Sequence, residues 1–214
     1  MLPIRALSML RRVFVAMLLP CYVWSFEVLV VDQHGAPVSN AVVSIPEGSI
    51  TGVDSSPAVM DQVNKRFVPL VLAIPQGQEV IFPNSDNIRH HVYSFSEPKR
   101  FEIKLYKGTA KAALPFNEAG VVVLGCNIHD SMIGYIFVSP WPDFRVSDET
   151  GRLSFEGTAQ QLAVWHPWVE GLSEPMMVDL GADKAEQTRK IILKLKPPKP
   201  LINLKEKFRT YRDD

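Results

Sequence analysis

The sequence predicts an all-β protein with a larger β-sandwich followed by a smaller β-rich unit. Short runs of β-branched and aromatic residues recur along the chain, separated by turns that contain glycine or proline. No segment between residues 26 and 138 carries apolar residues at helical spacing. The chain has 214 residues, of which 46% are hydrophobic and 21% charged, enough to bury a sizeable core. This composition excludes fibrous, collagenous and wholly disordered proteins.

Residues 1–25 are typical of a secretory signal peptide. Arg5, Arg11 and Arg12 precede an apolar run over 13–24, and no acidic residue lies in this stretch. The run is too short for a membrane-spanning helix, which needs about 20 residues. We expect cleavage before Phe26, export by the general or the twin-arginine route, and a periplasmic protein with no stable membrane insertion after cleavage.

Charge gives a weaker indication of partners. Basic and acidic residues number 23 each, so the sequence predicts no binding to nucleic acid. The charge is uneven along the chain, with −5 over 26–64, +4 over 65–111, −8 over 117–183 and +6 over 184–214. This pattern is compatible with a one-sided docking face and equally with solvated loops on a folded surface.

The first unit is expected to span residues 26–139. Its first strand, 26–31, leads into a turn at 32–35 and a second strand at 38–45, and a polar irregular connection follows over 46–67. The same alternation of β-rich runs and turns continues to the end of the unit. The remaining expected strands are 68–74, 79–82, 91–95, 101–106, 121–124 and 133–138.

The second unit is expected to span residues 140–196. It begins near a Pro-Trp-Pro segment, and a hairpin pattern over 144–155 is followed by two β-rich runs at 160–165 and 189–195. The Pro-rich segment from residue 197 ends regular structure. Asn203 and Glu206 form a capping-box pattern, so 197–214 is expected to be a linker with a short helix or a frayed tail.

The residues with distinctive chemistry lie in one segment, in which Cys126, His129 and Met132 follow a predicted strand at three-residue steps. Cleavage of the signal peptide removes Cys21 and leaves Cys126 as the single cysteine of the mature chain. A lone thiol in an oxidising compartment needs protection. A thiolate, an imidazole and a thioether suit a copper ion that changes oxidation state. Zinc fits less well, because a thioether is a poor zinc ligand.

A second imidazole would complete this set of ligands. His90 and His91 stand at the start of the predicted strand 91–95, after a polar loop that begins at Asn84. Either histidine can supply this second imidazole, because both lie at the start of that strand. Each of these residues also has an ordinary structural role available to it, since lone cysteines and methionines are most often core side chains.

The stretch 68–138 resembles the cupredoxins, and within them the plastocyanin- and amicyanin-like group labelled methylamine utilisation proteins. The resemblance rests on Phe-Pro-Asn-Ser-Asp-Asn-Ile-Arg-His-His-Val, which starts at residue 82, and on Cys-Asn-Ile-His-Asp-Ser-Met, which starts at residue 126, with Phe116 and Gly120 ahead of the latter. It implies a Greek-key β-sandwich fold. It also implies one copper ion held by His90, Cys126, His129 and Met132.

Two positions depart from the cupredoxin pattern. The residue after the first ligand is commonly Asn in that family, and here it is His91, so His91 is the alternative first ligand if the strand is shifted by one residue. Asp130 follows His129, where the family usually has a neutral apolar rim. A carboxylate there would stabilise the oxidised, more positive metal.

The resemblance implies a type 1 copper protein that carries single electrons between redox partners docking near His129, without catalysis of its own. One alternative is a module that stores, senses or delivers copper. A second is a non-catalytic periplasmic interaction domain in which residues 140–214 bind a partner. Membership of a copper oxidoreductase system would require further metal sites, and His34 and His166 do not form a ligand cluster by spacing.

Overall fold

The protein is built from short strands. The computed structural model describes residues 25–109, 112–169, 174–181 and 188–196, and within them it contains 19 strands and no helix. The all-β prediction is therefore confirmed. None of the described residues forms a helix that is long and apolar enough to cross a membrane.

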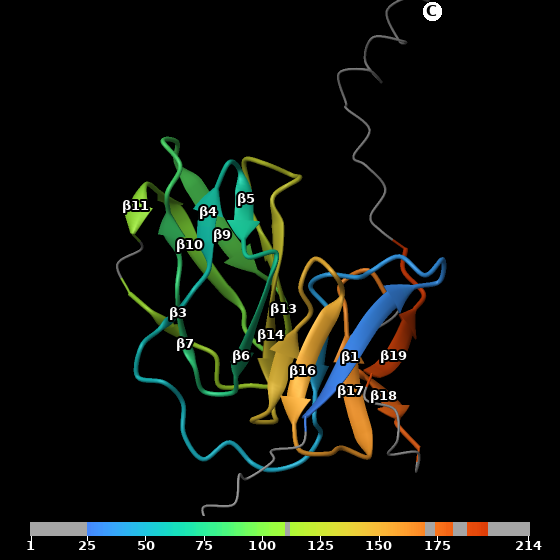
Figure 1. The fold of residues 1–214 in the computed structure, drawn as a ribbon. Helices are drawn as coiled ribbons and strands as arrows, with labels where there is room; N and C mark the ends of the chain where they lie inside the picture. Colours follow the sequence, from blue (N-terminus) through green and yellow to red (C-terminus); the bar gives the residue numbers. More distant parts are fainter. Residues whose placement is uncertain (1–24, 110–111, 170–173, 182–187, 197–214) are drawn as a thin grey trace, which may run out of the picture.

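The first unit is a sandwich of one large sheet and a layer of shorter pairings (Figure 1). The large sheet has the order β10-β9-β13-β14-β6, in which all pairs are antiparallel except β14 with β6. Its strands are β6 (Val71–Pro75), β9 (His90–Ser94), β10 (Phe101–Tyr106), β13 (Gly120–Gly125) and β14 (Ile133–Ser139). The opposite layer consists of β3 (Ala58–Val59), β4 (Asp61–Val63), β5 (Arg66–Val68), β7 (Glu79–Ile81), β8 (Pro83–Asn84), β11 (Gly108–Thr109) and β12 (Leu114–Pro115).

The core of the first sandwich follows from the alternation of side chains along these strands. In β13, Val122 and Leu124 are fully buried, whereas Val123 between them points outward and is exposed. The inward-facing side chains from both layers meet in one cluster, and each buried Val, Leu, Ile or Phe contributes about 1.5–3 kcal/mol. Cys126 and Met132 belong to this cluster, so the loop after β13 is anchored to the core.

The second unit consists of two further sheets. One has the order β16-β1-β19, and the other has the order β15-β2-β17-β18. The buried hydrophobic side chains of the core between them are Val, Ile, Leu, Ala and Phe. The strands are β1 (Ser25–Asp32), β2 (Val42–Ser44), β15 (Phe144–Val146), β16 (Arg152–Glu156), β17 (Gln161–Trp165), β18 (Met176–Asp179) and β19 (Thr188–Leu193).

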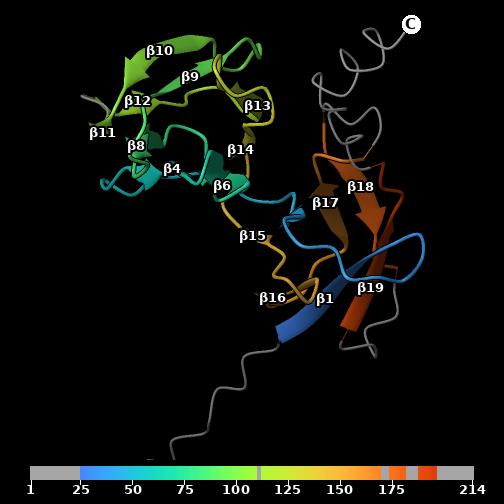
Figure 2. The same ribbon diagram turned by 90° about the horizontal axis from the view of Figure 1, so that it is seen from above.

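The boundary between the units differs from the sequence prediction, which assigned residues 26–139 to one domain. β1 pairs with β16 and, in parallel, with β19, and β2 pairs with β15 and β17. Residues 25–45 therefore belong to the second unit. Figure 2 shows the two units side by side, with β1 next to β19 and away from β9 and β10. The prediction was wrong here because an apolar run indicates a strand but not its partner in the sheet.

The chain leaves the second unit after β2 and returns to it at β15. The two strands are neighbours, since Ser44 pairs with Phe144, and the Ile45 N–H donates to the carbonyl of Asp143 at 2.9 Å. The first sandwich thus lies between two adjacent strands of the second unit. Residues 46–67, predicted to be irregular, contain the short strands β3, β4 and most of β5.

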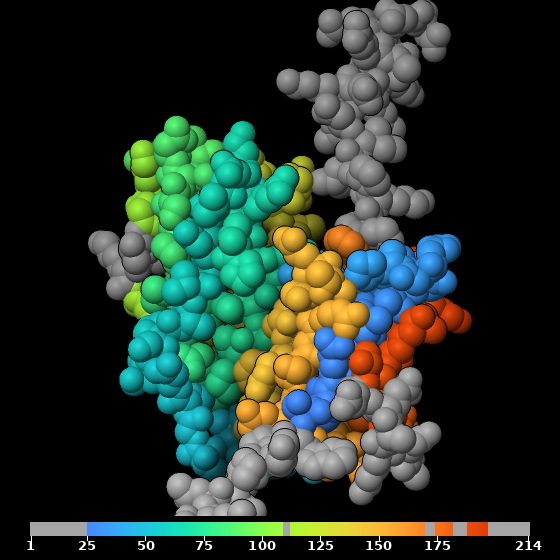
Figure 3. Space-filling model, viewed as in Figure 1, coloured from blue at the N-terminus to red at the C-terminus, as the bar shows by residue number. Residues whose placement is uncertain are grey.

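The two units are in direct contact, as the space-filling view shows (Figure 3). A third hydrophobic cluster joins them. The ring of Phe137 on β14 lies 5.5 Å from that of Trp165 on β17, and Val42 and Val71 complete the cluster. The predicted signal peptide over 1–24 and the predicted tail over 197–214 lie outside the described residues.

Candidate metal centre

Two consecutive turns position the side chains of the loop that follows β13. The His129 N–H donates to the carbonyl of Cys126, and the Met132 N–H donates to the carbonyl of His129 at 2.9 Å. Each turn returns the chain after three residues, which is the spacing observed between the three side chains. Cys126 and Met132 are buried, whereas His129 is partly exposed. The loop therefore directs its sulfur atoms into the core and leaves its imidazole at the surface.

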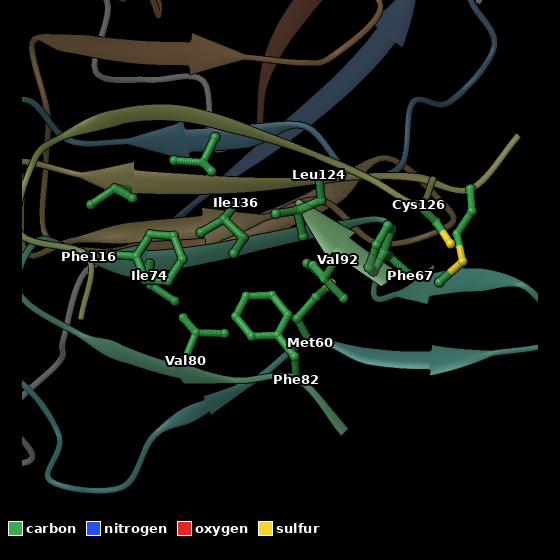
Figure 4. Packing of buried hydrophobic residues seen from close by; sticks show 13 residues of the cluster. Met60, Phe67, Ile74, Val80, Phe82, Val92, Phe116, Leu124, Cys126 and Ile136 are labelled. Atoms are coloured by element: carbon green, nitrogen blue, oxygen red, sulfur yellow. The ribbon is translucent and has the colours of Figure 1, made fainter. Parts of the chain in front are cut away.

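Cys126 lies at one end of the hydrophobic core, close to Phe67 and far from Phe116 (Figure 4). Gly125 precedes it, and the ring of Tyr93 lies where a side chain of that residue would be, with a ring carbon 2.6 Å from the position of an added Cβ. A larger residue at 125 would displace either the Tyr93 ring or the strand that delivers the thiol. The end of β13 is thus fixed by packing from both layers.

His90 is the second imidazole that reaches this thiol. Its Nδ1 lies 3.9 Å from the Sγ of Cys126, and the Nδ1 of His129 lies at the same distance from that sulfur. The ligand atoms of the three residues all lie within 4.8 Å of one another. In the part of the chain that the structure describes, this is the one group of three His, Cys, Asp or Glu side chains arranged to hold a metal ion.

His91 points away from the cluster. Successive side chains of a strand face opposite sides of the sheet, so only one of two neighbouring histidines on β9 can face the thiol. The Nε2 of His91 lies 2.9 Å from a carboxylate oxygen of Glu102 on β10, and its ring lies beside that of Tyr93. Of the two histidines that the sequence left open, the structure brings His90 to Cys126 and His129.

Asp86 holds the imidazole of His90 from behind. Its Oδ2 lies 2.6 Å from the Nε2 of His90, and its two carboxylate oxygens also accept the N–H groups of Asn64 and Lys65. Burial raises the pKa of Asp86, but hydrogen bonds from Lys65, His90 and Asn64 outweigh it and keep the pKa below its usual value. The carboxylate is therefore ionised, and it fixes the ring so that Nδ1 faces the sulfur.

Asp86 was not identified in the sequence analysis. The signal was present, because Asp86 stands four residues before His90 in the polar loop, but a surface carboxylate is the ordinary interpretation of such a residue. Asn84, the first residue of this polar loop, holds the loop itself. Its side chain donates to the carbonyls of Ile88 and Tyr106 at 2.9 Å and accepts the N–H of Asp86 at 3.1 Å.

The electrostatics at His129 favour the neutral ring. Partial burial lowers the pKa of His129 most. The charges of His90 and Lys65 lower this pKa further, and the charge of Asp86 raises it. A neutral imidazole has a lone pair that can bind a metal, whereas an imidazolium has none. The Nδ1 atoms of His90 and His129 both face the buried thiol of Cys126.

The donors present fit copper. Two imidazole nitrogens and one thiolate, with a buried thioether from the same loop, match the ligands of redox-active copper sites in proteins. Met132 packs in the same cluster of buried side chains as Cys126.

No protein-family model matches the sequence, and no curated protein matches it. Several solved structures are similar to the chain. A Cu-containing nitrite reductase from Thermus scotoductus matches with a TM-score of 0.38 and 23% identity over 52% of this chain, which spans 28% of that longer one. The P52G mutant of amicyanin, in a reduced Cu(I) form, matches with a TM-score of 0.36 and 22% identity over 45% of this chain and 98% of its own.

A purple cupredoxin from Nitrosopumilus maritimus matches with a TM-score of 0.33 and 25% identity, over 38% of this chain and 96% of its own. The amicyanin and the purple cupredoxin are thus each matched over nearly their whole length by less than half of this chain.

Proposed function

We propose that this chain is a periplasmic type 1 copper protein that carries single electrons between redox partners. The observation that carries the proposal is the convergence of His90, Cys126 and His129, with both Nδ1 atoms 3.9 Å from the same buried sulfur. Met132 is the fourth proposed ligand. When bound, one copper ion supplies a centre that alternates between Cu(I) and Cu(II).

The surrounding residues make this site rigid. His90 is the first residue of β9, which is paired on both sides in the large sheet, and its ring is held by Asp86; Cys126 is anchored at the end of β13. Such a site can keep nearly the same positions of its donors in both oxidation states, so little has to move when an electron is transferred. The partly exposed ring of His129 is the proposed contact for redox partners.

The proposed periplasmic location rests on the signal-peptide pattern of residues 1–25, and it is compatible with a single buried thiol in the mature chain. We propose a carrier and not an enzyme, because a copper oxidoreductase would require further metal sites, and among the described residues one group of three side chains is arranged to hold a metal ion.

Titration of the purified mature protein with Cu(II) tests the proposal. We expect an intense visible absorption that saturates at one equivalent, and a copper–sulfur bond in X-ray absorption spectra. Cys126→Ser should abolish both signals, whereas Ser131→Ala, an exposed change in the same loop, should leave them intact. A loaded wild-type protein without a copper–sulfur bond would refute the proposal.

The delivery and storage alternative predicts a different outcome. It requires looser coordination and rapid exchange, and His91 would have supported it as an extra ligand. His91 instead bonds Glu102 outside the cluster. A colourless copper adduct that gives up its ion to a mild chelator would favour delivery, and the absence of any adduct would leave the interaction-domain alternative.

A further inference from the structure

Four segments meet at the end of the first sandwich that carries His129. They are the β4–β5 turn at 63–66, the loop 85–89 before β9, residue 107 after β10, and the loop 127–131. We call this surface the metal end. Figure 1 shows the β4–β5 turn and the loops before β9 and after β13 at the same end of the sandwich, and Figure 3 shows the first two as open surface.

The metal end carries four exposed cations, namely Lys65, Arg66, Arg89 and Lys107. Among the residues that the structure describes, none of them forms an ion pair, whereas arginines elsewhere do, such as Arg145 with Asp143. Exposed cations are often solvated without a partner, but these four lie on segments that share the metal end. Lys65 is close enough to His129 to contribute to its electrostatic environment.

The carboxylates of the same segments do not cancel this charge. Asp86 is directed inward and is engaged by His90 and by two backbone N–H groups. Asp130 is the one exposed carboxylate of the metal end. The positive charge over residues 65–111 in the sequence is thus concentrated in part on this surface.

Two apolar side chains are exposed on the same segments. Ile128, which precedes His129, is 48% exposed, and Ile88, in the loop before β9, is 36% exposed. An apolar centre with a charged rim is the usual composition of a protein contact surface, in which the rim steers the encounter and the centre supplies the buried area.

We propose that the metal end docks a redox protein whose contact surface carries carboxylates around an apolar centre. This inference rests on the proposed function, because it assigns the partner of the proposed copper site. The positive rim would attract and orient an acidic surface, which raises the association rate at low ionic strength.

Small redox ions of opposite charge test this inference without the natural partner. The Cu(I) protein is mixed with hexacyanoferrate(III), an anion, or with tris(phenanthroline)cobalt(III), a cation, and each takes one electron as Cu(I) becomes Cu(II). The variant Lys65→Glu/Arg89→Glu reverses two rim charges. Lys190→Glu/Lys194→Glu, at exposed positions of the second unit, makes the same change in net charge and is the control.

We expect the rim variant to lower the rate with hexacyanoferrate about tenfold at low salt and to raise the rate with the cobalt complex, with both effects removed by salt. The control should change each rate by less than twofold. A changed reduction potential would move both rates in the same direction, so opposite changes report steering. If the protein forms the copper–sulfur bond but the rim variant reacts with both redox ions at the wild-type rates, this inference alone is overturned. If no copper–sulfur bond forms, the proposed function is overturned and this inference with it.

Discussion

His90 in the first sandwich and His166 in the second unit are both almost completely buried, yet their ring nitrogens face different partners. The Nε2–H of His166 donates to the carbonyl of Ser39, and its Nδ1 accepts the N–H of Trp168, each at 3.2 Å. The Nε2 of His90 is held by Asp86, and its Nδ1 faces a thiol. His166 therefore supports two loops of the second unit, whereas His90 presents a nitrogen to a potential ligand site.

The same contrast holds for the two cores. Val, Ile, Leu, Ala and Phe make up the buried cluster of the second unit. The core of the first sandwich ends in Cys126 and Met132, beside a buried histidine. His90 and His166 thus differ in whether the backbone uses both ring nitrogens, and substitutions in the two units test what this difference means for metal binding.

Removal of the two buried imidazoles should give the largest difference. His90→Ala is expected to abolish the visible absorption of the copper-loaded protein, because one of three strong ligands is lost. His166→Ala should leave the absorption intact but lower the free energy of unfolding by about 2 kcal/mol, through lost packing and hydrogen bonds. Copper titration followed by absorbance, together with urea unfolding, measures both.

His91→Ala is the control for that experiment and should change the absorption only slightly, because its ring lies outside the cluster. Loss of the absorption in His91→Ala and its retention in His90→Ala would reverse the assignment of the ligand.

The next largest effect is a loss of folding stability at acidic pH. Burial lowers the pKa of His166 to about 4, from an ordinary value of 6.5, while its hydrogen bond to Ser39 opposes this shift. The unfolded chain therefore binds a proton at His166 between pH 6.5 and 4 that the folded chain does not. Stability must fall as pH falls through this window, by about 3 kcal/mol at pH 4. Urea unfolding of the metal-free protein at pH 7 and pH 4 measures this loss.

His166→Gln removes the titrating group and should make the pH dependence shallower over this window, whatever its effect on stability at pH 7. An equal slope in the variant and the wild type would show that His166 does not carry the effect.

The smallest effect is expected from the carboxylate behind the metal site. Asp86→Asn should lower copper affinity by about 10- to 100-fold, because the amide holds the ring of His90 less firmly and the negative charge is lost. Glu102→Gln makes the same chemical change at the other histidine–carboxylate pair of β9 and should leave copper affinity unchanged. Competition with a copper chelator of known affinity measures both, and equal losses in the two variants would contradict the positioning role of Asp86.

The sequence was most informative where the site depends on one loop. Two turns bring Cys126, His129 and Met132 to one side of the chain at three-residue steps, so their spacing alone predicted that they belong together. The choice between His90 and His91 depended on which face of β9 meets β13, and an extended segment does not specify its face by itself. Asp86 could not be identified because its role depends on the β4–β5 turn, which supplies two N–H groups from 21 or more residues away.

The assignment of residues 26–45 failed for a related reason. The apolar pattern of β1 correctly indicated a strand, but its partners are β16 and β19, more than 120 residues later. Nothing in the run itself distinguishes these partners from the nearer strands of the first sandwich. Pairing over such separations is decided by the complete set of sheets.

The proximity of β2 and β15 has a consequence for how the molecule is assembled. Ser44 and Phe144 are paired, so the whole first sandwich occupies the position of a hairpin connection in the second unit. In the second unit β19, its last described strand, pairs with β1, and the first sandwich is an insertion held at both of its ends. A different domain inserted between β2 and β15 would leave every described strand of the second unit in place.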